Sequence, residues 1–190
     1  MGWRNSAVKL LSDRMTQPRA YLAGPDVFLP NAATQAQAKI ALCAAYGLEG
    51  IAPFNPELDL SLPPDQLWRR IFADDVQMMR DCDIIIANLT PFRGASADAG
   101  TLVELGWFLG AGRPAYGYSN NAEAFAARAH AHMALVPDPL PGIEVEDFGL
   151  ADNLMIEGAL AGGIVLPPDG TSRPFDSLDV FEFCLKRITG

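Results

Sequence analysis

Three consecutive isoleucines, Ile84 to Ile86, constrain the fold of this chain more than any other feature of its sequence. They lie in the stretch from Asp83 to Leu89, which has the length of a β-strand and is far too short to span a membrane. Successive side chains of a strand point to opposite faces, so an uninterrupted isoleucine run needs apolar cover on both sides. Strands of this kind are typical of parallel sheets that carry helices on both faces.

Strand and helix patterns alternate on either side of this strand. Short apolar runs predict strands at 19–23, 49–53, 83–89 and 113–118. Helical spacing predicts helices at 31–46, 65–80, 98–111, 123–133 and 153–161, with a terminal helix at 175–188. The alternation predicts a doubly wound α/β fold: about five parallel strands, right-handed crossovers and helices on both faces. Ligands of such folds bind at the carboxyl ends of the strands.

Length and composition limit the domain organisation and the partners. The 190 residues are expected to form one domain over 19–190, preceded by a flexible or helical N-terminal extension over 1–18. A formal net charge of -9 offers no field to offset phosphate repulsion, so neither nucleic acid nor an anionic membrane is an expected partner. Cys43, Cys82 and Cys184 lie in apolar runs without zinc-site spacing, which predicts buried free thiols in a reducing cytoplasm.

Three segments follow predicted strands and are expected to line one crevice. They are Gly24-Pro25-Asp26, the stretch from Asn88 to Asp98, and the loop after Tyr118. The second segment opens a helix that is apolar on nearly every side, which predicts a buried helix, yet this helix carries Glu104. A buried carboxylate must be paired, hydrogen-bonded or neutral, because an uncompensated buried charge is costly.

The spacing of these acids leaves their roles open. Glu104 is either a catalytic carboxylate or one that faces solvent or is satisfied by backbone donors. Asp98 stands where helix N-caps stand, and six helical positions rotate it away from Glu104, so the two converge only if Asp98 is the non-helical cap. Pattern alone favours a solvated helix face for Asp74 and Asp75.

Five short motifs, taken in order, resemble the nucleoside 2-deoxyribosyltransferases. They are Tyr21–Phe28, the helix around Asp75, Ala87–Gly94, Asp98–Thr101 with Glu104–Gly106, and Asp152–Met155. Each motif is weak by itself, but five in the right order over roughly residues 20–162 are a strong signal. The resemblance implies a flavodoxin-like fold. It also implies an enzyme that exchanges the base of 2′-deoxynucleosides through a covalent deoxyribosyl-enzyme intermediate.

The resemblance further implies a role for each site residue. Glu104 is the nucleophile at C1′, and Tyr21 hydrogen-bonds to it and holds its orientation. Asp75 transfers the proton of the base, and Asp98 contacts the sugar hydroxyls and can share the acid role. Further substrate contacts are expected within the chain from Gly24, Asp26, Phe28 and Phe92. Two more contacts, Asn153 and Met155, are expected from a neighbouring subunit of a homo-oligomer. The ligands are 2′-deoxynucleosides and free purine or pyrimidine bases, and neither a metal nor an organic cofactor is needed.

Two other functions remain open from the sequence. A related group of enzymes hydrolyses 2′-deoxynucleoside 5′-phosphates, and Arg93 and Ser96 stand beside a predicted helix start where a phosphate could dock. The acidic net charge and Asn153, which suits an uncharged hydroxyl, favour the transferase. The chain could also be a nucleotide-binding sensor without chemistry, since fold alone does not give function. A costly buried Glu104 argues against a pure binder.

Overall fold

The computed structural model describes residues 17–55, 57–136 and 138–190, and its centre is a five-stranded sheet. The strands lie in the order β2-β1-β3-β4-β5, and every neighbouring pair is parallel. Their bounds are β1 (Arg19–Ala23), β2 (Glu49–Ile51), β3 (Ile84–Asn88), β4 (Ala115–Tyr118) and β5 (Ile164–Val165). The doubly wound parallel fold predicted from the sequence is confirmed.

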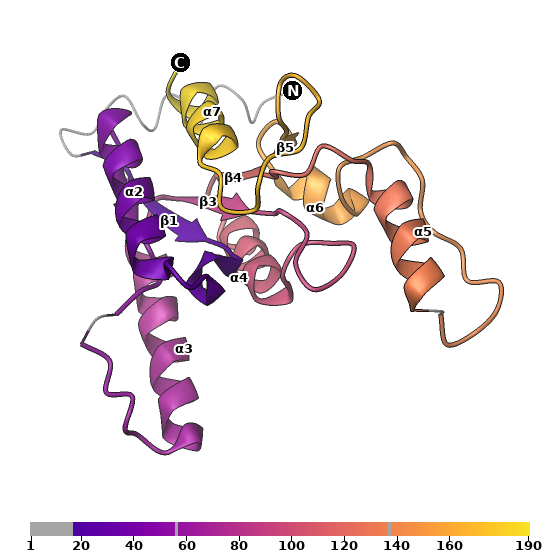
Figure 1. Ribbon diagram of the computed structural model, residues 1–190. Helices are drawn as coiled ribbons and strands as arrows, with labels where there is room; N and C mark the ends of the chain where they lie inside the picture. The colour runs from indigo at the N-terminus through magenta and orange to yellow at the C-terminus, as the bar shows by residue number, and fades with distance from the viewer. Residues whose placement is uncertain (1–16, 56, 137) are drawn as a thin grey trace.

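Helices cover both faces of the sheet (Figure 1). One face packs against α2 (Ala32–Ala45) and α7 (Asp179–Thr189), and the other against α3 (Pro64–Asp81), α4 (Ala99–Gly110) and α6 (Leu154–Ala159). A short 3-10 helix, η1 (Pro25–Phe28), follows β1 directly. The remaining helix, α5 (Phe125–Leu135), projects from the side of the sheet on which α6 lies.

The isoleucine strand β3 is the middle of the core. Ile84 and Ile86 pack in the cluster that contains α7, and Ile85 packs in the cluster that contains Leu105 and Phe108 of α4. All three isoleucines are at most 1% exposed. Burial of this strand on both faces is therefore confirmed, and it follows from the alternation of side chains along an extended backbone.

The structure departs from the sequence predictions in three elements. The strand β5 has two residues after Gly162-Gly163, too few for a periodic pattern, and η1 falls in a segment predicted as loop. Helix α4 was expected to be buried all round, but Val103 is 72% exposed and Leu109 is 48% exposed. The expectation that α4 is buried on all sides is wrong, because the sheet covers only one side of this helix.

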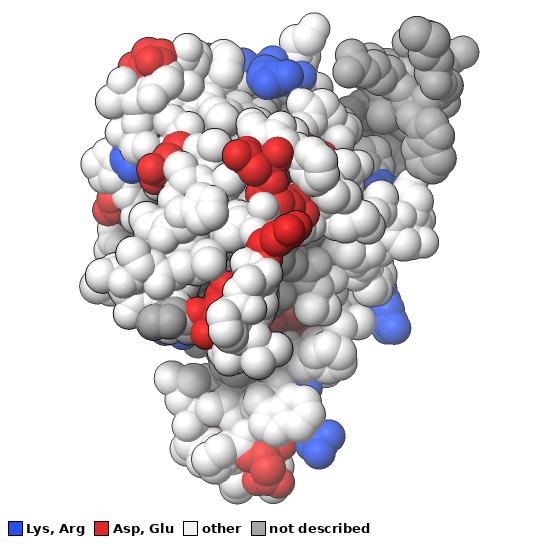
Figure 2. Space-filling model, turned by 90° about the vertical axis from the view of Figure 1, so that its right-hand side faces the viewer, with Lys and Arg blue, Asp and Glu red and all other residues white. Residues whose placement is uncertain are grey.

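Other expectations concern the chain as a whole. The three cysteines are buried and free, as predicted. Of the predicted N-terminal extension, residues 1–16 lie outside the described part of the chain. No helix among the described residues combines the length and the apolar character that a bilayer crossing requires. The face in Figure 2 carries a band of Asp and Glu side chains, with Lys and Arg mostly toward its margins, so this face has no broad basic surface.

The strand order reverses between β1 and β3, and in doubly wound sheets ligands bind at the carboxyl ends of the strands beside such a reversal. Gly24, directly after β1, has a φ of 151° and lies against Asn88 at the end of β3. A Cβ on Gly24 would stand 2.7 Å from the Asn88 Cβ, so only glycine allows the two strand ends to approach this closely. The sequence-predicted segments after β1 and β3 therefore meet at one edge.

Gly117 in β4 tests how tightly the sheet packs against α6. A Cβ at this position would lie 2.6 Å from the buried Leu89 Cδ1 and 3.2 Å from Leu160 Cδ1. We expect Gly117→Ala to lower the free energy of unfolding by about 1–3 kcal/mol, measured by urea denaturation, because the core must shift to admit the methyl group. Gly110→Ala is the control, since a Cβ there meets nothing within 4 Å. Equal stabilities of the two variants would contradict this packing.

Candidate active site

The side chain of Glu104, in the second turn of α4, is hydrogen-bonded to a buried tyrosine of β1. Tyr21, which is fully buried on β1, donates its hydroxyl proton to Glu104 Oε1 over 2.7 Å. The Tyr21 ring stacks on Phe108 of α4 at a centroid distance of 6.1 Å, and this contact restrains the orientation of the ring. Burial and the neighbouring carboxylate raise the pKa of Tyr21, so its hydroxyl stays protonated and remains a donor.

The environment of Glu104 changes its proton affinity. Burial raises its pKa to about 7, and the negative charges of Asp75 and Asp98 add to the rise, while the hydrogen bond from Tyr21 opposes it. These electrostatic effects mean that three acids from α3, the α4 cap and α4 itself share one neighbourhood. A carboxylate that titrates near neutrality and lies among other acids is a mark of catalytic sites.

Asp98 is the N-cap of α4. Its backbone is extended, with φ −62° and ψ 133°, and its Oδ2 accepts hydrogen bonds from the Thr101 backbone N at 3.0 Å and the Thr101 Oγ1 at 3.2 Å. The cap position, outside the helical turn, is the condition under which the sequence allowed Asp98 and Glu104 to converge. Oδ1 makes no hydrogen bond within the described residues, so it is available to a ligand.

The two adjacent acids of α3 differ in their environments. Asp74 is bonded to Arg70 and to the side chain of Asn55, which hold its pKa below the usual range. Asp75 has no such partner among the described residues, and burial, with the charge of Asp74, raises its pKa to about 6. A carboxyl group with this pKa retains a proton in part of the population near neutral pH. The solvated helix face suggested by the pattern describes Asp74 better than Asp75.

A buried ion pair anchors the loop after β1. Lys39 of α2 is 4% exposed, and its Nζ lies 2.6 Å from Asp26 Oδ2. The same carboxylate accepts from Asn88 Nδ2 at 3.1 and 3.2 Å, and Asn88 Oδ1 in turn accepts from Thr90. Asp26, predicted to contact substrate, thus has both oxygens engaged within the chain. Its substrate contact remains a prediction, and its observed bonds hold η1 against the end of β3.

Aromatic side chains lie at the end of η1 and in the loop after β3. The rings of Phe28 and Phe92 stack at 5.5 Å with an angle of 9° between their planes, and Phe175 lies 6.0 Å from Phe92. The guanidinium of Arg93 lies 5.1 Å from the Phe28 ring centre and 4.7 Å from that of Phe92. Phe28 is 57% exposed, so part of this apolar surface is open to a planar ligand.

The predicted contributors to a neighbouring site begin α6. Asn153 caps this helix through a 3.0 Å bond from the Met155 backbone N, and its amide nitrogen donates to Glu146 Oε2 at 2.9 Å. The side chain of Met155 is 69% exposed. Neither residue hydrogen-bonds to Tyr21 or Glu104 in the described structure.

Three comparisons with known proteins show which family this chain belongs to and which structures it is similar to. Residues 20–155 match the family model described as nucleoside 2-deoxyribosyltransferase. The chain belongs to the nucleoside 2-deoxyribosyltransferase family. It is therefore a transferase enzyme of the kind that acts on nucleosides and nucleobases.

Individual relatives extend the comparison. The chain is similar to a solved structure of a 2-desoxiribosyltransferase from Leishmania mexicana, with 27% identity, a TM-score of 0.59, and 89% of this chain and 97% of that chain covered. A conserved protein from Enterococcus faecalis V583 shares the fold, with 19% identity, a TM-score of 0.53, and coverage of 90% and 99%. An uncharacterized protein of Schizosaccharomyces pombe is 30% identical over 169 residues, which are 78% of this chain and 80% of that protein.

Several residues of the site carried no signal in the sequence. Lys39 and Arg128 are single cations in Ala-rich helices, and nothing local indicates that each forms an ion pair with an acid in another element of the fold. Ser96 was considered from the sequence as a hydrogen-bond donor to a phosphate. In the structure its hydroxyl donates a hydrogen bond to Asp152 Oδ1 at 2.6 Å. Within the described ranges, no group of three or more His, Cys, Asp or Glu side chains is arranged to hold a metal ion.

The raised pKa of Glu104 leads to a prediction about stability. A pKa above the ordinary 4.5 means that the contribution of Glu104 to stability is fully present below that value and is lost as pH rises through about 7. Glu104→Gln removes this loss and keeps an oxygen for Tyr21. We expect the variant to exceed the parent protein in free energy of unfolding by up to about 3 kcal/mol near pH 8.

Denaturant unfolding measured at several pH values checks this expectation. The advantage of Glu104→Gln should shrink as pH falls toward about 5, where the parent side chain is protonated in the folded state. The exposed Glu144 provides the control, because Glu144→Gln removes the same charge without relieving a buried carboxylate. A stability difference independent of pH would contradict the burial of an ionisable Glu104.

Proposed function

We propose that this chain transfers the 2-deoxyribosyl group of a 2′-deoxynucleoside to another nucleobase through a covalent intermediate on Glu104, with retention of configuration. The observation that carries the proposal is the hydrogen bond from the buried Tyr21 to Glu104 Oε1, beside two further acids. One carboxylate oxygen accepts from Tyr21, and the other is free to attack C1′. The donor and acceptor substrates are 2′-deoxynucleosides and free bases.

The first half of the reaction forms the glycosyl enzyme. As the bond from C1′ to the base nitrogen breaks, its electron pair leaves with the base, and positive charge develops on the sugar next to the Glu104 carboxylate. Glu104 then bonds to C1′, and Asp75 supplies a proton to the departing base. A pKa of about 6 suits Asp75 to this role, because the group can hold and release a proton near neutral pH.

The second half reverses these steps with a different base. A nitrogen of the incoming base attacks C1′ and displaces Glu104, and its proton returns to Asp75. Two inversions at C1′ give retention. Asp98, whose Oδ1 has no hydrogen bond within the described chain, contacts the sugar hydroxyls near the reacting centre and can share the acid role. The open ring of Phe28, with Phe92 behind it, covers the base and helps exclude water.

Exchange between deoxyadenosine and free cytosine tests the reaction directly. Chromatography should detect deoxycytidine with the parent protein, and Glu104→Gln should reduce its formation at least about a thousandfold, since loss of a nucleophile removes the covalent route. Glu144→Gln serves as the matched control. Mass spectrometry of acid-quenched enzyme should show one added deoxyribosyl group in the parent and none in Glu104→Gln.

The other outcomes of this assay distinguish the alternatives. Adenine with free deoxyribose, in place of deoxycytidine, identifies a hydrolase, and no change in deoxyadenosine identifies a binding protein. Full exchange by Glu104→Gln overturns the assignment of the nucleophile. An enzyme that hydrolyses 2′-deoxynucleoside 5′-phosphates needs hydrogen-bond donors for the phosphate. The Ser96 hydroxyl, one of the two candidates, already donates its hydrogen bond to Asp152.

We further propose that the enzyme is a homo-oligomer in which Asn153 and Met155 complete the site of a neighbouring copy. Helices α4 and α6 pack against each other, and both expose large apolar side chains: Val103 at 72%, Leu154 at 42% and Met155 at 69%. Apolar side chains left open in this way favour contact with another protein surface. In the neighbouring site, Asn153 binds the 5′-hydroxyl of the sugar.

Mixed oligomers test the donation of Asn153. Asn153→Ser keeps an oxygen for the α6 cap but loses the amide, and we expect it to raise the KM for the nucleoside about tenfold through loss of one hydrogen bond. When this variant is mixed with Glu104→Gln chains, a site can form with Glu104 from one chain and Asn153 from the other. Such sites should regain the parent KM. A mixture with the KM of Asn153→Ser alone would contradict a shared site.

A further inference from the structure

Asp152, directly before Asn153, is a buried hub of hydrogen bonds. Its side chain is 1% exposed, and its Oδ1 accepts from Ser96 Oγ at 2.6 Å and from the Asn153 backbone N at 2.8 Å. Its Oδ2 accepts from the Ala97 backbone N at 3.1 Å. One carboxylate therefore ties the residues just before Asp98 to the residue that begins α6.

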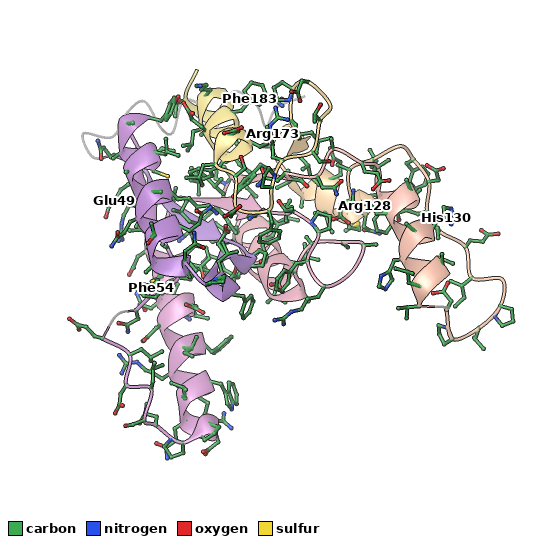
Figure 3. The ribbon with its side chains drawn as sticks, viewed as in Figure 1. Glu49, Phe54, Arg128, His130, Arg173 and Phe183 are labelled. Atoms are coloured by element: carbon green, nitrogen blue, oxygen red, sulfur yellow. The ribbon has the colours of Figure 1, made fainter. Side chains whose placement is uncertain are left out.

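Arg128 supports this carboxylate from α5. Its side chain is 7% exposed, and Nη2 lies 3.7 Å from Asp152 Oδ2. The same guanidinium donates from Nε to the Ala95 carbonyl at 2.9 Å, from Nη2 to the Ala151 carbonyl at 2.7 Å, and from Nη1 to the Glu123 carbonyl. Figure 3 shows Arg128 directed toward α6, whereas His130 lies on the outer side of α5. The arginine thus clamps both chain segments that Asp152 joins.

The cost of this arrangement argues for more than packing. An ion pair removed from water loses hydration that its attraction only partly restores, and an apolar pair of similar volume is often at least as stable. What charged hydrogen bonds give in addition is fixed geometry, and a catalytic group displaced by about 1 Å can lose about a hundredfold in rate. The two segments fixed here carry Asp98 and Asn153, which the proposed function assigns to different active sites.

We propose that Asp152, held by Arg128, is a positioning residue for two active sites at once. Through Ser96 and Ala97 it sets Asp98 in the site of its own chain. Through the backbone of Asn153 it sets the side chain that completes the neighbouring site. Asp152 thus has two arms: the hydrogen bonds to Ser96 and Ala97 are the first, and the hydrogen bond to Asn153 is the second. The second arm rests on the proposed function, in which Asn153 is donated to another copy.

Separate variants address the two arms. Asp152→Asn keeps the shape but turns one acceptor into a donor, so it disturbs both arms, and we expect kcat to fall about tenfold to a hundredfold while the nucleoside KM rises. Ser96→Ala removes only the hydrogen bond on the Asp98 side, so kcat should fall and KM should stay within about twofold of the parent. Arg128→Lys keeps the charge and should retain more activity than Arg128→Met.

Mixed oligomers separate positioning from general damage. Chains of Asp152→Asn are mixed with a large excess of Glu104→Gln chains, which lack the nucleophile but present a normal Asn153. Every working site then has Glu104 and Asp98 from the Asp152→Asn chain and Asn153 from the helper. We expect KM to return to the parent value while kcat stays low. A helper with both Glu104→Gln and Asn153→Ser should leave KM raised.

The contrary results are equally specific. Parent kinetics in Asp152→Asn, a KM unaffected by the helper, or recovery of kcat together with KM would overturn the proposal. If Asp152→Asn does not fold, as judged by thermal unfolding and gel filtration, Arg128→Lys replaces it in the same mixtures. Failure of Glu104→Gln and Asn153→Ser chains to complement each other would overturn the shared site itself. If Glu104→Gln and Asn153→Ser chains do complement each other but the helper does not change the KM of Asp152→Asn, only the positioning role of Asp152 is overturned.

Discussion

The parallel pairing of β1 with β3 is the contact on which the rest of the site depends. Its register sets Tyr21 opposite Ile85 and Ala23 opposite Ala87, so the two strands end together. Tyr21 points to the face covered by α4, whereas Ala20 and Leu22 point to the face covered by α7. A hydroxyl from the first strand can therefore reach Glu104, and the loops that follow both strands open at the same edge.

Charge is distributed unevenly over the acids at this edge. Asp26 and Asp152 each pair with a buried cation, Lys39 and Arg128, and bind several donors, so they act as anchors for backbone segments. Glu104, Asp75 and Asp98 have no cation partner within the described residues. Burial raises the pKa of Glu104 to about 7 with the help of the charges on Asp75 and Asp98, and it raises that of Asp75 to about 6 with the help of the charge on Asp74. The fold thus pairs the acids that hold the loops with cations, whereas Glu104 and Asp75 lack such a partner and have pKa values nearer neutrality.

Sequence patterns were reliable where one element determined the outcome. The alternating pattern predicted four of the five strands in place, and the helix cap at Asp98 followed from its position before an apolar helix. The two-residue β5 escaped prediction because it is too short for periodicity. The open side of α4 also escaped, since an apolar pattern indicates that a surface favours burial without showing what covers it. Asp75 and Asp74 are neighbours in sequence, and only packing distinguishes the half-buried acid from the one bonded to Arg70.

The sequence by itself determined the architecture and the family, and it predicted Glu104 as the carboxylate at the centre of the candidate site. These depend on local periodicity and on the order of short motifs, which are both properties of the linear chain. The resemblance had already implied the hydrogen bond from Tyr21 to Glu104. Only the tertiary structure decided the ion pairs of Lys39 with Asp26 and of Arg128 with Asp152. The reason is physical, because the energy of a buried charge depends on what surrounds it in space, and residues far apart in the chain provide those surroundings.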